Sequence, residues 1–345
     1  MRRLVLDLRE RRPLWTLPDW AAEEIRAAVP PEWETVEVRA AADGQGDGGG
    51  PSPEALEAVR GAEVYLGYGI PRELFRAATA PPEGRLRWVH SGAAGVGGSL
   101  HPEMRGSGVV LTNSAGIHAE PIADSVLAMA LHFARGLDFA VRAQAERRWW
   151  KEPFERADAP VREVEELTVG LLGLGGIGRA VARRFSALGS RVLATRRRGG
   201  DAPEGVELLG GDDAFGRLLE RSDVLVVAVP ETPETRGMVG GAELARLPRG
   251  AVLVNVARGR VVDEEALAEA LRAGRLRGAA LDVFAREPLP PESPLWGLSN
   301  MLLTPHVSGT SHRFWRRETD LIVENLRRYV AGEPLLNTVD KTAGY

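Results

Sequence analysis

The sequence of 345 residues contains no cysteine, and this absence excludes several kinds of chemistry at once. Without a thiol the chain cannot form disulfides, thiolate metal sites or a cysteine nucleophile. A protein without disulfides suits a reducing compartment, so we expect a cytoplasmic location. The N-terminal segment agrees with that expectation, because Asp7 and Arg9 interrupt its apolar run too early for a signal peptide.

Positive charge in excess and long apolar runs are also lacking. The net charge is −4, so the chain has no strong basic field with which to hold nucleic acid or an anionic membrane. No apolar stretch approaches the roughly 18 residues of a membrane span. The only lysines are Lys151 and Lys341, and neither has the surroundings of a Schiff-base or phosphate-loop lysine. The histidines show no metal-ligand spacing, so we expect no metal site.

What is present is an ordinary globular composition, with 44% apolar and 27% charged residues, in a chain long enough for two domains. In the first part, short apolar runs alternate with turn and helix signals, which predicts an α/β unit. A helix is expected after Ser52, with Pro53 at its first position. The Gly-rich segment Ala42–Gly50 is typical of an exposed insertion. The strand candidates are Leu4–Leu8, Glu63–Gly67, Leu86–His90 and Val109–Thr112.

The second part has the clearest pattern, because apolar strands alternate with amphipathic helices from Leu167 onward. Such alternation predicts a parallel sheet covered by helices on both faces. Long helices are expected before it, over Glu120–Gly136, and after it, over Arg313–Ala331. Another is expected over Asp263–Ala273, with Asp263 as its N-cap. The strand candidates are Thr168–Leu172, Arg191–Thr195, Val224–Val229, Ala251–Val256, Gly278–Phe284 and Met301–Thr304.

A glycine motif, Gly173-x-Gly175-x-x-Gly178, follows the first of these strands and opens a helix over Ile177–Leu188. This is the context that a dinucleotide site requires, and it outweighs the alternative of a glycine-rich turn in some other α/β protein. The glycines allow a tight turn, close approach to the pyrophosphate and packing of helix on strand. The helix N-terminus adds N–H donors and a positive dipole end. The predicted contacts are Gly173, Gly175, Gly176, Ile177 and Gly178.

Arginines follow the second strand where NAD sites usually carry an acid. Arg196 and Arg197 stand there, Arg198 follows, and the first acid is Asp201. Arginine cannot accept a hydrogen bond from a ribose hydroxyl, but it can clamp a 2′-phosphate. We therefore predict that NADP(H) is preferred over NAD(H). A solvated run of arginines is the alternative.

Three titratable residues, Arg258, Glu287 and His306, also follow predicted strands. Ligands of open parallel sheets bind at the carboxyl ends of strands, so these residues are expected near the dinucleotide. Hydride transfer to a 2-keto acid needs a cation for the carboxylate, an acid for the carbonyl oxygen and a partner that orients the acid. Taken singly, each is more often a surface charge, a cap or a loop residue. Because all three follow successive strands of one predicted sheet, the catalytic interpretation is favoured over these separate roles.

Taken together, these motifs resemble the D-2-hydroxyacid dehydrogenase family, whose members are D-isomer-specific and NAD(P)-dependent. The resemblance runs from about Gly92 to Gly309, and the first 80 residues carry little of it. One departure is Gly97, where many members have aspartate. Another is Asp124 in place of a glutamate. The matching segments are Gly173–Gly178, Val229–Thr235, Asn255–Leu267, Leu281–Leu289 and Thr304–Gly309, with weaker matches at Ser91–Val96 and Thr112–Gly116.

The resemblance implies the α/β class with two Rossmann-like domains, each a doubly wound parallel sheet. Residues 1–115 plus 311–345 would form a flavodoxin-like substrate domain completed by the C-terminal helix. Residues 116–310 would bind the dinucleotide and carry a dimerisation helix and arm at about 120–150, so a homodimer is expected.

Roles for single residues follow from the same resemblance. It makes His306 the acid/base, Glu287 its partner and Arg258 the carboxylate-binding cation, helped by the backbone amides of Ala94 and Gly95. His90, just before that loop, is expected to approach the cleft. The implied cofactor-lining residues are Val229, Pro230, Val256, Ala257, Asp282, Ser308 and Gly309.

The implied activity is reduction of a small 2-keto acid to the D-2-hydroxy acid, as in a glyoxylate/hydroxypyruvate reductase. Phosphoglycerate dehydrogenase is an alternative that needs further cations, for which Arg72, Arg76 and Arg85 are candidates. Formate dehydrogenases pair their histidine with glutamine, so Glu287 argues against that activity. A non-catalytic dinucleotide-sensing protein, like the family's corepressors, would retain the same residues and stays open.

Overall fold

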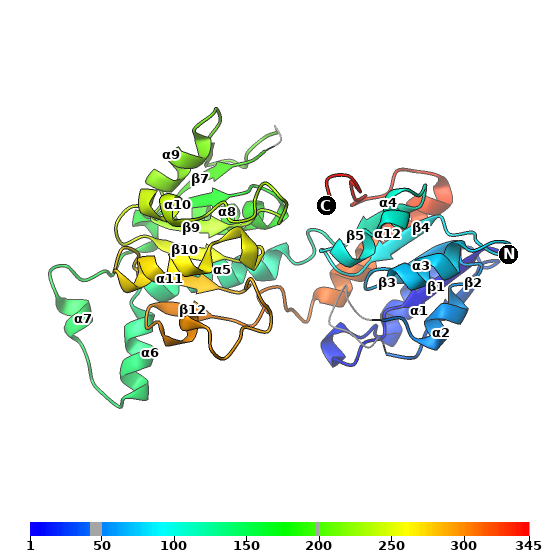
Figure 1. Cartoon of the computed structure of the whole chain (residues 1–345), viewed down its shortest axis with the longest axis horizontal. Coiled ribbons are helices and arrows are strands. Elements are labelled where there is room, and N and C mark those ends of the chain that lie inside the picture. The colour runs from blue at the N-terminus through cyan, green and yellow to red at the C-terminus, as the bar shows by residue number, and fades with distance from the viewer. Residues whose placement is uncertain (42–49, 198–199, 345) are drawn as a thin grey trace. The chain divides into compact units, whose positions relative to one another are not determined.

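The chain forms two compact units in the computed structural model, which describes residues 1–41, 50–197 and 200–344. The first unit consists of Met1–Ile117 and Ser311–Tyr345, and the second of His118–Thr310 (Figure 1). Most of the predicted insertion Ala42–Gly50, and Arg198, lie outside the described residues. The substrate and dinucleotide roles of the two units remain predictions at this point.

The first unit is built on a parallel sheet of five strands in the order β2-β1-β3-β4-β5. This is the flavodoxin-like order of a doubly wound sheet. The sequence analysis missed β2, because three of its four residues are polar and all four are half-buried at the sheet edge. The strands are β1 (Arg3–Asp7), β2 (Glu34–Glu37), β3 (Val64–Gly67), β4 (Trp88–Ser91) and β5 (Val110–Asn113).

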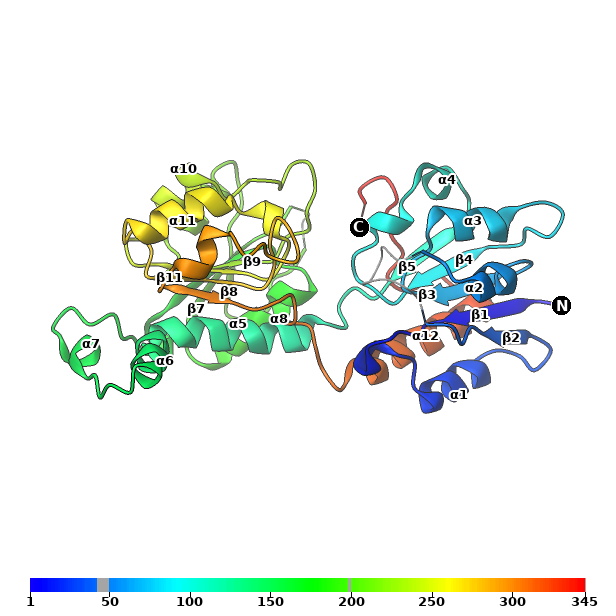
Figure 2. The same ribbon diagram turned by 60° about the horizontal axis from the view of Figure 1, so that its bottom comes forward.

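Helices cover both faces of this sheet, as a parallel sheet requires (Figure 2). On one face, α1 (Asp19–Ala27) and the C-terminal helix α12 (Phe314–Ala331) pack over Leu4 and Leu6. On the other, α2 (Pro53–Ala58) and α3 (Arg72–Thr79) pack over Val5, and the short α4 (Pro102–Arg105) follows. Ser52 caps α2 as predicted, since its hydroxyl accepts a hydrogen bond from the Ala55 amide.

The second unit has a parallel sheet of seven strands in the order β12-β11-β10-β9-β6-β7-β8. The connections change direction between β6 and β9, which is the switch point where dinucleotides bind in such sheets. The edge strand β8 was missed, because it is short and only partly buried. The strands are β6 (Thr168–Leu172), β7 (Arg191–Thr195), β8 (Val206–Leu208), β9 (Val224–Val227), β10 (Val252–Asn255), β11 (Gly278–Leu281) and β12 (Met301–Leu303).

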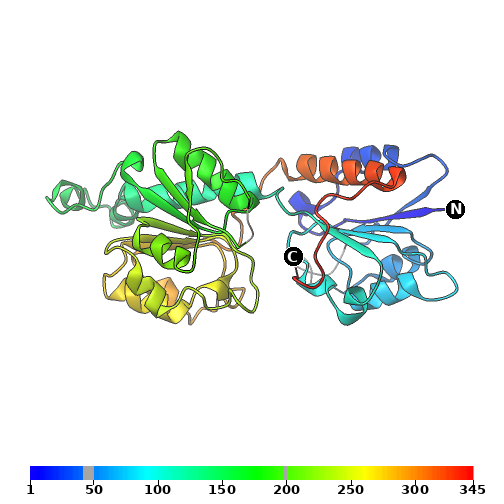
Figure 3. The ribbon, with the colours of Figure 1, turned by 90° about the horizontal axis from the view of Figure 1, so that it is seen from above.

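The helices of the second unit form a layer on each face of its sheet (Figure 3). One layer contains α5 (Ala119–Ala134) and α8 (Gly176–Ala187), whose apolar faces cover Val169 and Leu171. The other contains α9 (Ala214–Glu220), α10 (Gly241–Arg246) and α11 (Glu264–Arg272). Beyond α5 the chain projects from the unit as an arm with α6 (Leu137–Ala145) and α7 (Glu152–Glu155) (Figure 1). In the described parts of the chain, every helix is too short or too polar to span a membrane.

Candidate active site

The predicted nucleotide and catalytic segments of the second unit lie along one edge of its sheet. Each begins within two residues of the end of a strand, and these strands are neighbours in the sheet. Because carboxyl ends of parallel strands share an edge, this arrangement fits a ligand site there. In the order of the sheet the segments are 304–309 after β12, 282–287 after β11, 256–260 after β10, 229–235 after β9 and 173–178 after β6.

The glycine loop has a shape that other residues could not adopt. Gly173 has φ +105°, and a Cβ there would come within 2.7 Å of Ala228 O. A Cβ on Gly178 would come within 2.2 Å of Gly173 O, so the helix packs directly on the turn. By contrast, a Cβ on Gly175 would have no atom within 4 Å, so its surroundings are open. The loop therefore combines two packing glycines with one that leaves backbone accessible.

The N-terminus of α8 can bind an anion. The helix begins at Gly176, and no side chain caps it. Gly175 and Gly176 are exposed, and Ile177 is half-buried. Free N–H groups at the start of a 12-residue helix give a positive end that suits a pyrophosphate. Val229 and Pro230, which are predicted to line the cofactor, lie in the loop after β9, the strand that pairs with β6.

Arg196 lies at the end of β7, beside this loop in the sheet. It is half-buried, and within the described segments no carboxylate pairs with it. The Arg196 guanidinium lies close to Gly200, because a Cβ built on Gly200 would come within 2.6 Å of the guanidinium. Arg197 is exposed, and its charge helps to lower the pKa of Glu234, although a hydrogen bond with Thr232 contributes more. Arg196 is therefore the better-placed cation for a 2′-phosphate.

His306 and Glu287 meet, although 19 residues separate them in the chain. His306 Nδ1 lies 2.7 Å from Glu287 Oε2, and Glu287 Oε1 accepts a hydrogen bond from the Phe284 amide at 2.9 Å. The histidine side chain is 50% exposed, and Nε2 has no partner within the described segments. An ionised Glu287 places the proton of a neutral imidazole on Nδ1, so Nε2 is the nitrogen left to exchange a proton with a ligand.

Asp282 holds the histidine loop in place, a role that the sequence analysis missed. Its carboxylate is buried and accepts hydrogen bonds from the Thr304 hydroxyl at 2.5 Å and the Val307 amide at 2.9 Å. Its other oxygen accepts the Ser308 amide at 3.0 Å and the Ser308 hydroxyl. These bonds bracket His306, whose φ of +54° is a left-handed conformation. The expectation that Asp282 lines the cofactor stays a prediction, and its carboxylate oxygens accept hydrogen bonds from the histidine loop.

Arg258 follows β10 in a loop fixed by Asn255. The buried Asn255 side chain accepts the Ala257 amide at 3.0 Å and donates to Arg258 O at 3.1 Å. The Arg258 side chain is exposed, donates to Ala257 O at 2.7 Å and makes no ion pair with Glu287. A Cβ on Gly259 would lie 1.8 Å from the carbonyl carbon of Phe284, so this loop packs on the segment that carries Glu287.

The other predicted cofactor-lining residues differ in accessibility. Val256 and Ala257 are buried in the core, and Ser308 is buried beneath the histidine loop. Gly309 O accepts a hydrogen bond from His118 Nδ1 at 3.2 Å, if that nitrogen carries the proton. Their backbones, rather than their side chains, are therefore what a cofactor could contact.

Ala94 and Gly95 belong to the first unit and follow β4. The Asn113 side chain donates to Ala94 O at 2.8 Å, and the Ser114 amide donates to Ala93 O at 3.4 Å. The N–H groups of Ala94 and Gly95 have no partner among the residues that the structure describes. The carbonyls of Ala93 and Ala94 are therefore engaged, while two adjacent amides are available as donors, and a carboxylate is an acceptor that can use them.

The expectation for His90 is wrong. The side chain is fully buried, with Nδ1 2.9 Å from the Thr112 hydroxyl and Nε2 2.9 Å from Glu318 Oε1. These two polar partners hold the ring in the interior of the first unit, so it offers no surface to a substrate.

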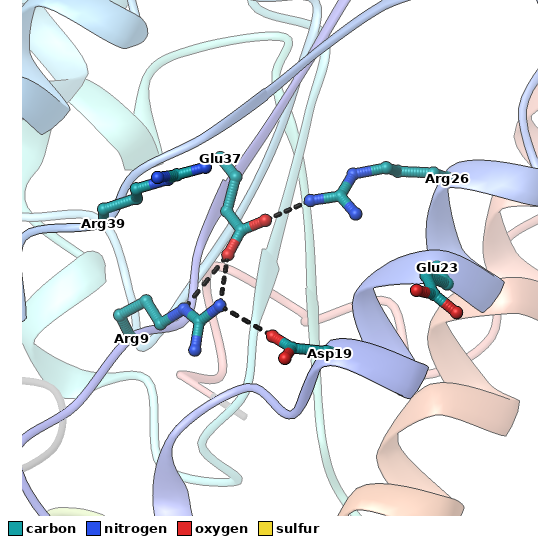
Figure 4. Close-up of a pocket in the computed structure, with 6 residues that line it drawn as sticks. All are labelled: Arg9, Asp19, Glu23, Arg26, Glu37 and Arg39. Atoms are coloured by element: carbon teal, nitrogen blue, oxygen red, sulfur yellow. Dashed lines mark hydrogen bonds and ion pairs between the residues drawn. The ribbon is translucent and has the colours of Figure 1, made fainter.

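A pocket of about 510 Å³ in the first unit is lined by none of the predicted site residues (Figure 4). Glu37 accepts hydrogen bonds from Arg9 at 2.7 Å and from Arg26, and Asp19 accepts one from Arg9 at 3.2 Å. Carboxylates and arginines balance in number here, which is typical of a solvated ion-pair network. Its lining residues are Arg9, Asp19, Glu23, Arg26, Glu37 and Arg39.

Comparison with known proteins gives a consistent family. Residues 127–308 match the model of the D-isomer specific 2-hydroxyacid dehydrogenase NAD binding domain. A glyoxylate reductase of Korarchaeum cryptofilum is 37% identical over 79% of this chain and 80% of its own length. A D-3-phosphoglycerate dehydrogenase of Archaeoglobus fulgidus is 35% identical over 68% of this chain but only 43% of its own length. The crystal structure of a D-isomer specific 2-hydroxyacid dehydrogenase from Xanthobacter autotrophicus Py2 in complex with NADPH and MES is 34% identical, with a TM-score of 0.78 over 100% of this chain and 99% of that one.

Proposed function

The chain belongs to the D-isomer-specific 2-hydroxyacid dehydrogenase family, and on that premise we propose that it is an NADPH-dependent reductase of small, unphosphorylated 2-keto acids such as glyoxylate or hydroxypyruvate. It is an NAD(P)-dependent oxidoreductase of the α/β class. The observation that carries the proposal is the 2.7 Å contact between His306 Nδ1 and Glu287 Oε2, which leaves Nε2 free at the carboxyl edge of the sheet.

The residues present fit a dinucleotide. The open backbone at Gly175 and the uncapped N-terminus of α8 would hold the pyrophosphate, and Arg196 would hold a 2′-phosphate. When bound, the nicotinamide supplies the hydride that reduces the keto carbon.

The chain's own groups would supply the remaining chemistry. Arg258 would bind the substrate carboxylate, together with the free amides of Ala94 and Gly95. His306 Nε2 would donate a proton to the carbonyl oxygen as negative charge develops there. Glu287 would hold Nδ1, and so keep Nε2 directed at that oxygen.

A keto-acid panel tests this proposal directly. We expect NADPH oxidation with glyoxylate or hydroxypyruvate, and weaker activity with 3-phosphohydroxypyruvate; pyruvate and phenylpyruvate report the tolerated side-chain size. Absence of turnover on every keto acid, with NADPH still bound, would favour the dinucleotide-sensing alternative.

Phosphoglycerate dehydrogenase activity has less support, because the candidate phosphate-binding arginines are engaged or distant. Arg72 and Arg76 both bind Glu103, at 2.7 and 2.6 Å. The hydrogen bond from Arg72 is the main cause that lowers the pKa of Glu103 to about 2, so this carboxylate stays charged. Arg85 precedes β4 and therefore lies at the amino end of that strand, opposite the end that carries Ala94.

The proposed NADPH preference rests on Arg196. In an Arg196→Glu variant, we expect kcat/KM for NADPH to fall by about 10- to 100-fold while that for NADH changes little, because a charged hydrogen-bond partner of the phosphate becomes a repelling one. The matched control is Arg191→Gln at the other end of β7, whose guanidinium pairs with Glu207 at 2.8 Å. A wild-type protein that uses NADH better than NADPH would contradict the proposal.

We further propose that the chain forms a homodimer through the arm after α5. The base of the arm is rigid, because Arg277 pairs with Asp138 through two hydrogen bonds of 2.6 and 2.9 Å and stacks over Phe139 at 4.4 Å. Its surface nevertheless exposes large apolar side chains, and such patches mark interfaces. They are Leu137 (47% exposed), Val141 (58%), Phe154 (37%) and Trp149 (90%).

Light scattering checks the dimer. We expect the wild type at twice 37.3 kDa and a Val141→Glu/Trp149→Glu variant at the monomer mass, because two charges would have to be buried in the interface. Trp296→Glu is the control, since this tryptophan is also exposed (57%) but lies outside the arm. A monomeric wild type would refute the assignment of the arm.

A further inference from the structure

The first unit contains a fully buried polar cluster that the proposed chemistry does not use. It joins His90 of β4, Ser114 just after β5 and Glu318 of α12, all shielded from solvent. Glu318 Oε1 lies 2.9 Å from His90 Nε2 and 3.0 Å from the Ser114 hydroxyl. The cluster therefore links the C-terminal helix to two neighbouring strands of the sheet.

Core stability alone does not account for this cluster. Glu318 Oε2 is buried and has no hydrogen-bond partner within the described residues, and such an oxygen costs free energy. Even a fully bonded buried ion pair is often no more stabilising than apolar side chains of equal volume. The contacts around the cluster indicate what else it does.

Ser114 connects the cluster to the loop of residues 91–95. Its hydroxyl lies 2.9 Å from Ser91 O, and its amide donates to Ala93 O at 3.4 Å. A serine hydroxyl has a single hydrogen, so Ser91 O and Glu318 Oε1 share one donor. His90 provides the second contact to Glu318, which keeps the carboxylate bonded when the serine hydrogen points to the loop.

The same loop is also supported from its other side. A Cβ on Gly92 would lie 3.2 Å from both the Leu8 side chain and the Tyr68 ring, so the loop backbone packs tightly against the residues that directly follow β1 and β3. With the loop supported from both sides, the amides of Ala94 and Gly95 are hydrogen-bond donors of the loop that have no partner among the described residues. Contacts from Ser114 to Ser91 O and Ala93 O hold the backbone just before these amides.

We propose that Ser114 and Glu318 are positioning residues, which hold the 91–95 loop so that its two free amides bind the carboxylate of the 2-keto acid. The inference rests on the proposed function, because it assigns the loop amides to that substrate. Neither residue is proposed to touch the substrate or the cofactor.

The test uses full-length variants with NADPH and the best keto acid of the panel. We expect Ser114→Ala to raise KM for the keto acid about 5- to 10-fold, through loss of hydrogen bonds that order the loop, with KM for NADPH within about twofold. Glu318→Ala should raise KM for the keto acid in the same way. Glu318→Gln keeps an acceptor at Oε1, so its KM for the keto acid should stay near that of the wild type. Faster hydrogen exchange in peptides covering 91–97 should accompany the KM increase, and this readout is independent of turnover.

Ser222→Ala is the matched control, because Ser222 is another buried serine whose hydroxyl donates to a backbone carbonyl, Leu218 O, at 2.5 Å. It should lower stability without a selective change in KM. If Ser114→Ala lowers Tm but leaves keto-acid KM and loop exchange unchanged, the cluster is only structural and the inference is wrong. Failure of the proposed function is a different result, namely a wild type that turns over no keto acid.

Discussion

A His306→Asn variant is expected to lose keto-acid reduction by about 10²- to 10⁴-fold in kcat, the usual contribution of a positioned general acid. Asparagine tolerates a left-handed backbone better than most residues, so it suits the φ of +54° at this position. The variant keeps the loop but removes Nε2, the nitrogen that has no partner among the described residues. Binding of NADPH, measured by fluorescence titration, should stay within about twofold, because the pyrophosphate and ribose sites involve other residues.

His312→Ala provides the control for His306, since His312 is an exposed histidine only six residues further along the chain. We expect wild-type kcat for this control. Substantial turnover by His306→Asn would remove the histidine from the proton-transfer step and, with it, the observation on which the proposed function depends. Loss of NADPH binding in the same variant would point instead to a collapsed loop.

The second large effect is expected at Asp282. In Asp282→Ala, the Thr304 hydroxyl and the amides of Val307 and Ser308 lose a buried charged acceptor. We expect the free energy of unfolding to fall by about 3 kcal/mol or more, because each hydrogen bond to a charged group contributes about 1.5 to 3 kcal/mol. Activity should fall with it, by about 100-fold in kcat, since a displacement of about 1 Å at a reacting group costs that much.

Denaturant unfolding and kcat of the folded protein check this prediction, and Asp263→Ala is the matched control. Asp263 also accepts two backbone amides, at 3.0 and 3.1 Å, but it does so as the N-cap of α11. Loss of an N-cap costs about 1 kcal/mol, and this cap has no contact with the histidine loop. An Asp282→Ala variant that is destabilised yet keeps its kcat would show that Asp282 supports the fold but does not position His306.

The regular elements could be predicted wherever their signal is local. β6 and β7 have the predicted bounds, and Asp263 caps its helix, because side-chain periodicity and capping depend on residues a few positions apart. β2 and β8 were missed for the converse reason. They are short, partly exposed edge strands whose conformation depends on pairing with a neighbour rather than on an apolar pattern of their own.

The candidate site divides in the same way. Arg258, Glu287 and His306 could be chosen because motif spacing and strand ends are properties of the sequence, and His306 does meet Glu287. Asp282 and Asn255 were not recognised as loop anchors, and His90 was misplaced. In each case the partner of a buried polar group lies on another segment of the chain, where sequence pattern carries no information about contact.

The sequence by itself thus determined the family, the parallel α/β architecture, the glycine loop and the candidates for the catalytic side chains. Only the tertiary structure decided the order of strands in each sheet, which carboxylate meets which imidazole, and which backbone amides remain free. The physical reason is the distance along the chain over which each interaction acts. Propensity, capping and turn geometry depend on residues a few positions apart, whereas burial and hydrogen-bond pairing are settled only when distant segments pack against each other.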